Sequence, residues 1–301
     1  MLGEFFLDLV FYGLPSKPRM GEEVKTESLE RVPGGGLATT SLVAHGLGTK
    51  TAVITRIGQD ALGNAAWQKM QRSGIAVDCC EVRADLPTAT TVCAAFDGDR
   101  MMITHDAINR HLEGLLDRSM VKKKIRNARH LHLACSLCPA KTWSKAIRRF
   151  REQGLTVSAD IGWNPEVMQS SRWPLVLREM EFVFPNEAEA EAMTGEKSIE
   201  KAAKRLARWI RVPVIKLGQD GSLAVVNGRM VRMKPLRVRA VDATGSGDAF
   251  NGGFLHGYLA GWTLEDCLRA GNICGALATT RPGGSSAIPT LKRLKKLMKQ
   301  L

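Results

Sequence analysis

The sequence lacks any long apolar run. No stretch approaches the roughly 18 apolar residues of a membrane-spanning helix. The first residues, Met1 to Glu4, carry an early acid and no basic segment, which argues against a secretory signal. We therefore expect a protein without a membrane partner, located in the cytoplasm.

Two common nucleotide-binding motifs are also absent. The chain contains no Gly-x-x-x-x-Gly-Lys-[Ser/Thr] sequence and no Gly-x-Gly-x-x-Gly sequence. These absences argue against a P-loop (Walker A) nucleotide site and against a dinucleotide-binding fingerprint. If the protein binds a nucleotide, it uses another kind of loop.

Seven cysteines are present, an odd number that favours free thiols over a disulfide framework in a chain of this length. Cys135 and Cys138 have metal-ligand spacing, and His130 and His132 precede them. A metal site is an alternative there, but no second pair of this kind completes it. The two histidines alternate with apolar residues, so we expect a strand that places both on one face.

The formal charge of +13 fits a nucleic-acid partner or small polyanions such as ATP. The most concentrated basic run is residues 291–301, where leucines recur at helical spacing. This pattern favours a packed helix with a solvated basic face over a nucleic-acid site.

The chain of 301 residues is 44% hydrophobic, enough for a sizeable core. Its first third is β-rich, with strands predicted over 5–12, 51–57, 88–96 and 101–104. From about residue 110, short apolar runs alternate with amphipathic segments such as 142–153 and 198–210. This alternation predicts an α/β fold with a parallel sheet, which binds ligands at the carboxyl ends of its strands.

The most informative segment is Val241 to Phe250, which contains the run Gly245-Ser246-Gly247-Asp248. We predict a strand over 233–240 before it and a helix over 249–260 after it. Small residues and exposed N–H groups at a helix start form an anion site, and Asp248 could accept a proton there. An aspartate in a first helical turn is also favoured by the helix dipole alone, and both interpretations stay open on spacing.

Segments in order along the chain resemble motifs of the ribokinase family, also called the phosphofructokinase-B sugar kinases. Asp242 to Asp248 resembles the family's Asp-Thr-x-Gly-Ala-Gly-Asp motif. The remaining similar segments are Gly34-Gly35 with Leu47-Gly48, Arg56 to Gly63, Pro185 to Glu189, Lys216 to Gly221, and Arg281 to Gly284 with Pro289.

The resemblance implies a three-layer α/β/α sandwich, a mostly parallel central sheet and a small β-sheet lid. It implies one kinase domain over residues 1–301, with the lid formed from about 9–33 and 86–106. It also implies catalysis with ATP and Mg²⁺, in some members helped by a monovalent cation such as K⁺. In several members the lids pair to form a homodimer, so we expect a homodimer here.

The resemblance also implies roles for individual residues. Asp248 would be the catalytic base, and the amides of Gly245, Ser246 and Gly247 would form an anion hole. The other implied groups are the acceptor-binding residues Asp8, Gly34, Gly35 and Thr39; the nucleotide-binding residues Asn186, Lys216, Gly218, Asp220, Gly221 and Asn272; Asn186 and Glu189 around Mg²⁺; and Asp242 and Gly283 near a monovalent cation.

Some of these residues also have a purely structural interpretation. Asn186 and Glu189 have the spacing of a helix capping box. Gly36 and Thr39 stand where ribokinases proper have Lys and Asn, which argues against ribose as the acceptor. The segment 160–166 follows a strand end and is expected to line the site, without assigned roles.

We therefore expect a kinase that phosphorylates a hydroxymethyl group of a small sugar or sugar acid, such as fructose or 2-keto-3-deoxygluconate. A nucleoside kinase is the alternative within the same fold, although only 6% of the residues are aromatic. A non-catalytic sugar- or nucleotide-sensing protein is the alternative from another class. The Asp248 loop disfavours that alternative, since a sensor needs no base.

Overall fold

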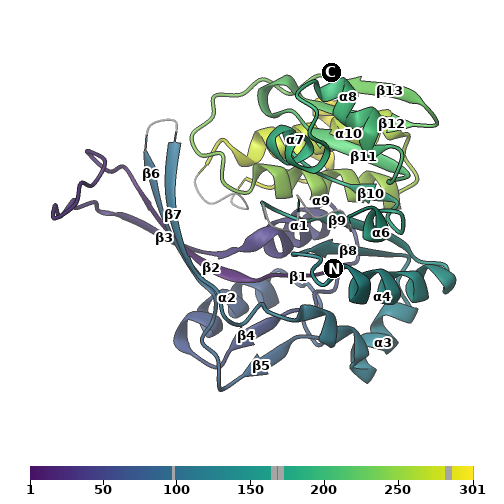
Figure 1. Ribbon diagram of the computed structural model, residues 1–301. Helices are drawn as coiled ribbons and strands as arrows, with labels where there is room; N and C mark the ends of the chain where they lie inside the picture. Colours follow the sequence, from purple (N-terminus) through teal and green to yellow (C-terminus); the bar gives the residue numbers. More distant parts are fainter. Residues whose placement is uncertain (97–98, 164–167, 169–172, 282–286, 301) are drawn as a thin grey trace.

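The computed structural model describes residues 1–96, 99–163, 168, 173–281 and 287–300. Within these residues, a seven-stranded sheet forms the centre of the molecule (Figure 1). The first five strands in spatial order run parallel to one another, the sixth runs antiparallel to them and the seventh pairs antiparallel with the sixth, which confirms the predicted mostly parallel sheet. In spatial order the strands are β1 Leu2–Gly3, β8 His130–Ala134, β9 Thr156–Asp160, β10 Phe182–Val183, β11 Val212–Lys216, β12 Ser222–Val226 and β13 Arg229–Met233.

Helices cover both faces of this sheet and complete the three-layer α/β/α arrangement. On one face lie α1 Gly35–Gly46, α9 Ser246–Leu259, α10 Leu264–Ala278 and α11 Leu291–Met298. On the other lie η1 Leu112–Asp117, α3 Ser119–Arg126, α4 Ala140–Glu152, α6 Trp173–Leu177, α7 Glu187–Thr194 and α8 Ile199–Leu206. Both faces of the parallel strands are therefore buried, as the apolar runs in the sequence indicated.

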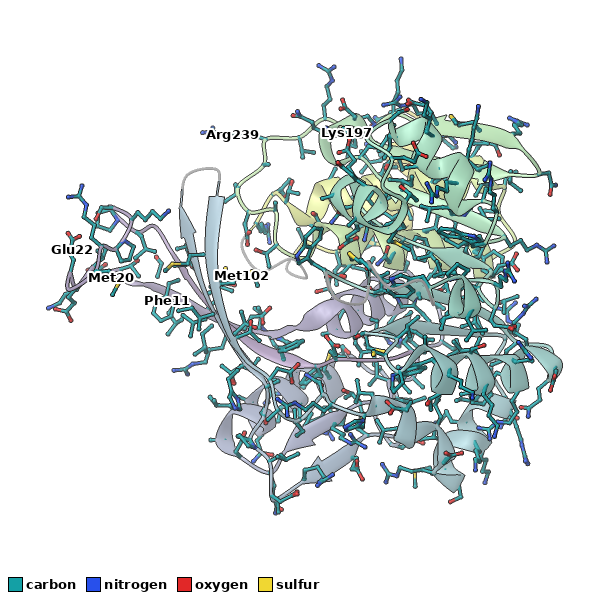
Figure 2. The ribbon with its side chains drawn as sticks, in the orientation of Figure 1. Phe11, Met20, Glu22, Met102, Lys197 and Arg239 are labelled. Atoms are coloured by element: carbon teal, nitrogen blue, oxygen red, sulfur yellow. The ribbon has the colours of Figure 1, made fainter. Side chains whose placement is uncertain are left out.

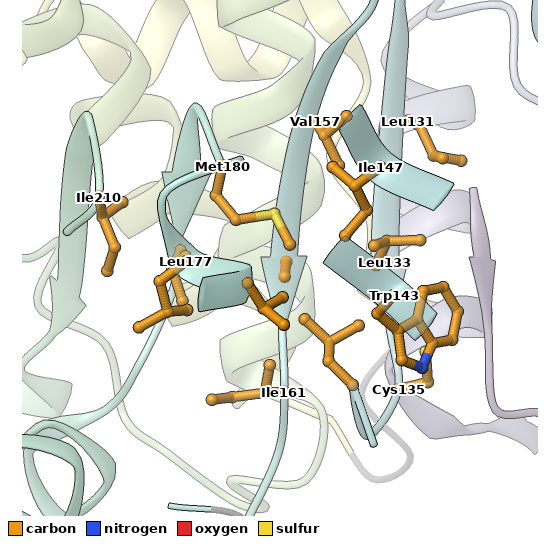
Figure 3. Close-up of a cluster of buried hydrophobic side chains, with 14 of the residues drawn as sticks. Leu131, Leu133, Cys135, Trp143, Ile147, Val157, Ile161, Leu177, Met180 and Ile210 are labelled. Atoms are coloured by element: carbon orange, nitrogen blue, oxygen red, sulfur yellow. The ribbon is translucent and has the colours of Figure 1, made fainter. Parts of the chain in front are cut away.

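The side chains of the central strands divide by alternation between the two faces. Leu131 and Leu133 of β8 join the apolar core beneath α4, which is drawn in Figure 3. Trp143, Ile147 and Phe150 recur at helical spacing on α4 and are fully buried against this core. The alternate positions of β8 face α9 instead. They include His132, whose ring is in edge contact with Phe184. This agrees with the predicted strand, which places His130 and His132 on one face.

A second, four-stranded sheet projects from the body beside the carboxyl ends of the central strands (Figure 1). It has the order β3-β2-β6-β7 and is formed by β3 Ser28–Gly34, β2 Phe6–Tyr12, β6 Thr90–Phe96 and β7 Asp99–His105. Figure 2 labels Phe11 of β2, and Met20 and Glu22 of the connection to β3, in the part of this sheet that projects from the body. These strands come from the segments in which the lid was expected.

Two predicted strands differ from the structure. In the segment 51–57 only β4, Arg56–Gly58, is a strand, paired with β5, Glu81–Arg83, next to helix α2, Ala61–Arg72. Residues before it form only isolated bridges, such as Ala52 with Ala76. The strand predicted over 233–240 is wrong, because β13 ends at Met233 and residues 234–240 have no regular structure.

The basic carboxyl-terminal run packs as its leucine spacing predicts. Leu294 of α11 is fully buried with Val43 and Leu277, while the neighbouring Lys295 and Lys296 are exposed. Across the described ranges, no helix is long and apolar enough to cross a membrane.

Candidate active site

A glycine in the left-handed region begins helix α9 and shapes the loop before it. Gly245 has φ +68° and is the N-cap of α9, a conformation that favours glycine. Before it, Asp242 Oδ1 accepts hydrogen bonds from the Thr244 N–H at 2.8 Å and the Thr244 hydroxyl at 2.6 Å, which close the turn. The helix begins at Ser246, earlier than the predicted start at Ala249.

The first turn of α9 offers backbone N–H groups to the cavity beside it. The first N–H groups of a helix have no acceptor within the helix, and the helix dipole makes this end positive. Ser246 and Gly247 both line the cavity, although the Ser246 N–H also makes a 3.3 Å bond to the Ala243 carbonyl. This turn therefore suits an anion.

Asp248 is the third residue of α9 and lies between this turn and the glycine run at the start of α1. A Cβ atom built on Gly36 would lie 3.0 Å from Asp248 Oδ1, so the missing side chain leaves room above the carboxylate. The Thr40 hydroxyl donates to the Asp248 carbonyl oxygen at 3.1 Å and ties α1 to α9. The position of Asp248 is therefore set by two helices.

The surroundings of Asp248 favour its protonated form. Withdrawal from water raises the pKa of Asp248 to about 7, and the negative charges of Asp160, Asp8 and Glu189 contribute to the rise. The Lys216 ammonium opposes this shift. A carboxyl group with a pKa near neutrality can accept a proton and return it at physiological pH.

An ion pair lies next to Asp248, at the carboxyl ends of β9 and β11. Lys216 Nζ donates to Asp160 Oδ2 at 2.6 Å, and Asn251 Nδ2 of α9 donates to the same oxygen at 2.6 Å. Burial disfavours both charges, but the pairing outweighs it, so that the pKa of Asp160 is lowered and the pKa of Lys216 is raised. Both groups are therefore charged at neutral pH.

A cavity of about 620 Å³ opens from this point along α9 and α10. Most of the predicted nucleotide-binding residues line it, together with the loop 235–240 that was wrongly predicted as a strand. The predicted residues in its wall are Lys216, Gly218, Asp220, Gly221, Ser246, Gly247 and Asn272. Gly218 and Asp220 belong to the short helix η2, Gly218–Asp220, which turns the chain from β11 into β12.

Asn272 has a structural task within this wall. Its side-chain amide donates to the carbonyl oxygens of Met233 at 3.1 Å and Lys234 at 2.9 Å. These bonds hold the start of the cavity-lining loop, on which Arg239 projects toward the four-stranded sheet (Figure 2).

Asn186 and Glu189 form the capping box that their spacing allowed. Asn186 Oδ1 accepts from the Glu189 N–H, and Glu189 Oε2 accepts from the Asn186 N–H, both at 2.8 Å. The box begins α7 directly after β10, and Asn186 bridges to Lys216 of β11. Burial and the charge of Asp160 raise the pKa of Glu189, while Lys216 opposes the rise.

The residues expected to bind the acceptor lie together on the other side of Asp248. Asp8 of β2 extends over Gly34, and a Cβ atom at Gly34 would overlap the Asp8 carboxylate. Gly35 has φ +81° and starts α1, in which Thr39 is buried. Burial raises the pKa of Asp8 to about 6, against a hydrogen bond from Thr91 that lowers it.

Of the possible monovalent-cation residues, Gly283 lies outside the described residues. Among the described residues, no cluster of three or more His, Cys, Asp or Glu side chains could hold a metal ion. At the metal-ligand spacing noted in the sequence, His130 forms hydrogen bonds with Thr156 and Ser158, Cys135 is buried and Cys138 is exposed.

Sequence reasoning placed Asp160 near the site but missed Asn251, although Asn251 lies one helical turn after Asp248.

Comparison with known proteins gives a family and a fold. The sequence profile of the pfkB family carbohydrate kinases matches residues 2–291. Three curated relatives are an uncharacterized sugar kinase of Archaeoglobus fulgidus (28% identity over 81% of this chain and 96% of the relative), the ribokinase of Haemophilus influenzae (26%, 96% and 94%) and the 2-dehydro-3-deoxygluconokinase of Bacillus subtilis (26%, 82% and 81%).

Solved structures agree over almost the whole chain. The ribokinase of Thermotoga maritima superposes with a TM-score of 0.81 at 25% identity, covering 99% of this chain and 98% of that one. A putative ribokinase II from E. coli, solved with ATP and Mg²⁺, has a TM-score of 0.84 at 20% identity, covering 100% and 98%. The ribokinase-like fold expected from the sequence is thereby confirmed.

Proposed function

Because the chain belongs to the pfkB family of carbohydrate kinases, we propose that it transfers the γ-phosphoryl group of ATP to a hydroxymethyl group of a small sugar or sugar acid. We propose a fructose-like ketose or 2-keto-3-deoxygluconate as the acceptor, in preference to ribose. One observation carries this proposal: Asp248 lies between the anion-binding turn of α9 and the open glycine run of α1.

Asp248 is proposed as the general base. Its carboxylate would take the proton of the attacking hydroxyl as the new O–P bond forms, and a pKa of about 7 suits that task. The amides of Gly245, Ser246 and Gly247 would stabilise the charge on the transferred group. Phosphoryl transfer depends mainly on such positioning and neutralisation.

The cavity along α9 fits the nucleotide. Its volume of about 620 Å³ is within the range of roughly 300–1,000 Å³ that is usual for ligand pockets. Gly218, Asp220 and Gly221 would follow the nucleotide, and Asn272 would lie near the adenine. The Asn272 amide reaches this region while it holds the loop after β13.

Mg²⁺ would be held through water rather than directly by Asn186 and Glu189. Asn186 Oδ1 and Glu189 Oε2 are occupied in the capping box, which leaves one carboxylate oxygen of Glu189 for a water ligand. When bound, Mg²⁺ would neutralise charge on the phosphates.

A monovalent cation such as K⁺ is proposed to bind near Asp242 and Gly283. Comparison of turnover in K⁺ and in a large organic cation tests this proposal.

The acceptor would bind between Asp8 and Asp248. The Asp8 carboxylate can accept two hydroxyl hydrogen bonds, which suits a polyol. Gly36 offers no side chain and Thr39 offers only a hydroxyl where ribokinases proper have Lys and Asn. This difference supports an acceptor other than ribose.

The four-stranded sheet is proposed as the lid of a single kinase domain and as the dimer interface. One of its faces carries the exposed side chains Leu29, Val92, Met101 and Ile103, of which Ile103 is 66% exposed. A row of exposed apolar side chains on a sheet is a typical interaction surface. Sedimentation of the wild type and of the variant V92D/I103D tests the dimer.

The function is tested by ADP release with Mg-ATP across a panel of sugars, sugar acids and nucleosides. We expect release with a sugar or sugar acid, and a loss of several orders of magnitude in Asp248→Asn with nucleotide binding retained. Release with nucleosides alone would contradict the proposed acceptor. Nucleotide binding without release for any acceptor would favour the sensing protein.

A further inference from the structure

We propose that the Lys216 ammonium is a catalytic cation that contacts the phosphoryl group during transfer, and that Asp160 and Asn251 are the residues that position it. This inference rests on the proposed kinase function and adds a specific charge to it. Lys216 ends β11, Asp160 ends β9 and Asn251 lies on α9, so three elements converge on the Asp160 carboxylate that holds the ammonium group.

The ammonium is held in one place by buried partners. In the ion pair the Lys216 side chain is 13% exposed and that of Asp160 is 10% exposed, while Asn251 is fully buried. Asp160 Oδ2 accepts from both Lys216 Nζ and Asn251 Nδ2 at 2.6 Å, and bonds of this length to a charged group are strong. Asn251 therefore fixes the carboxylate that fixes the lysine.

The same ammonium faces the place where the phosphoryl group would be transferred. Lys216 lines the cavity, and its Nζ lies 3.1 Å from the position of a Cβ atom built on Gly247. An ammonium has three N–H donors, so the bond to Asp160 leaves donors for a phosphate oxygen. The charge also acts on Asp248, because Lys216 lowers the pKa of that carboxyl group.

The position gives the ammonium a task in the reaction. The acceptor hydroxyl gives its proton to Asp248, and its oxygen forms a bond to the γ-phosphorus. The bond from that phosphorus to the bridging oxygen breaks, and its electron pair stays on ADP. Negative charge on the oxygens around phosphorus is stabilised by a fixed cation at hydrogen-bond distance without reorganisation.

The competing explanation is that Lys216 only neutralises the carboxylates around it. Asp160, Glu189 and Asp248 all interact with its charge, and a buried lysine could hold them together. A buried ion pair is weak evidence for stability, however, since an apolar pair of similar volume often serves as well. The two explanations differ in what happens when the pair is replaced by a neutral pair.

The test uses the double variant K216M/D160N, which removes both charges of the ion pair at similar volume, so that neither member is left charged without the other. We expect kcat for acceptor-dependent ADP release to fall roughly 100- to 1,000-fold, the usual cost of losing one charge-stabilising donor. The control is K124M/D78N, which neutralises a 2.7 Å ion pair on the surface and should retain wild-type kcat.

A binding measurement separates this inference from the function itself. If Lys216 contacts the γ-phosphate, wild type should bind a non-hydrolysable ATP analogue more tightly than ADP, and K216M/D160N should lose about tenfold of that preference. Asn251→Leu should lose part of it as well, at a lower melting temperature because the buried Asp160 carboxylate loses a hydrogen bond. These ratios are measured by calorimetry and need no acceptor.

Several results would overturn the inference. A double variant with wild-type kcat, or with an unchanged preference for the analogue over ADP, would show that Lys216 has only a structural role. The proposed kinase function would still stand in that case if Asp248→Asn lacked activity. A wild-type protein that binds neither nucleotide removes the proposed function and this inference together.

Discussion

The raised pKa of Asp248 predicts that the variant Asp248→Asn will be more stable than the wild type. In the folded protein its pKa is about 7, against 3.8 for an ordinary aspartate. Folding therefore favours the protonated form, and the stability from that form is fully present below pH 3.8 and lost as the pH rises through about 7. Asparagine cannot ionise, so Asp248→Asn avoids this loss.

The size of the effect follows from the shift. Each pKa unit corresponds to about 1.4 kcal/mol, so the full difference is about 4 kcal/mol at pH 8. Asp248 keeps some contact with solvent, which reduces the realised gain to about 2 kcal/mol. With an unfolding entropy of about 2.1 cal/mol/K per residue, that gain raises the melting temperature by about 3 °C in a chain of this length.

The assay is thermal unfolding of both proteins between pH 5 and 8, followed by circular dichroism. We expect the advantage of Asp248→Asn to grow with pH and level off above about pH 7. The control is Asp85→Asn, because the bonds from Arg83 lower the pKa of this exposed carboxylate and removing it should bring no gain at high pH. An advantage for Asp248→Asn that is absent, or that shrinks as the pH rises, would refute the reasoning.

Three further predictions concern the same site. The value of kcat/KM should fall about tenfold per pH unit below about pH 7, because Asp248, the proposed base, can accept a proton only when it is ionised; a flat profile of ADP release between pH 5 and 8 would contradict this. Gly34→Ala should raise the acceptor KM about tenfold or more, since its Cβ atom would displace the Asp8 carboxylate. A tenfold change corresponds to about 1.4 kcal/mol of acceptor binding free energy. Steady-state kinetics should show the ATP KM nearly unchanged in that variant, and Asp8→Ala should behave alike. Gly252→Ala should cost about 1–3 kcal/mol in urea unfolding by overpacking, because its Cβ atom would lie 2.7 Å from the Thr40 carbonyl oxygen and from Val43; equal stability would mean that α1 can move away from α9 freely.

The features that could be predicted from the sequence are those carried by neighbouring residues. The strands β8, β9 and β11 appear as short apolar runs because both of their faces are buried. The loop before α9 appears as small residues ahead of a helix. The resemblance to a known family added the order of the motifs, and the cavity collects most of the nucleotide-binding residues that it implied.

The features that could not be predicted depend on chain segments that meet only in the fold. Asp160 lies 56 residues from Lys216 and 91 from Asn251, so no local pattern links them. The strand predicted over 233–240 failed for a related reason. Pro235 has no N–H for a ladder, and the distant Asn272 takes the carbonyl groups that would have continued the strand.

Helix α9 joins the two halves of the site into one rigid unit. It carries the anion-binding turn, Asp248 and Asn251, and its glycines permit close packing on both neighbours. Gly252 lies against the backbone of α1, and Gly253 lies against Ala270 and Cys274 of α10. Because α1 begins at the glycine run of the proposed acceptor site and α10 lines the proposed nucleotide cavity, this packing would set the distance between the two ligands. Misplacement by 1 Å can cost about 100-fold in rate, so we expect movement on binding in the projecting four-stranded sheet and not between these helices.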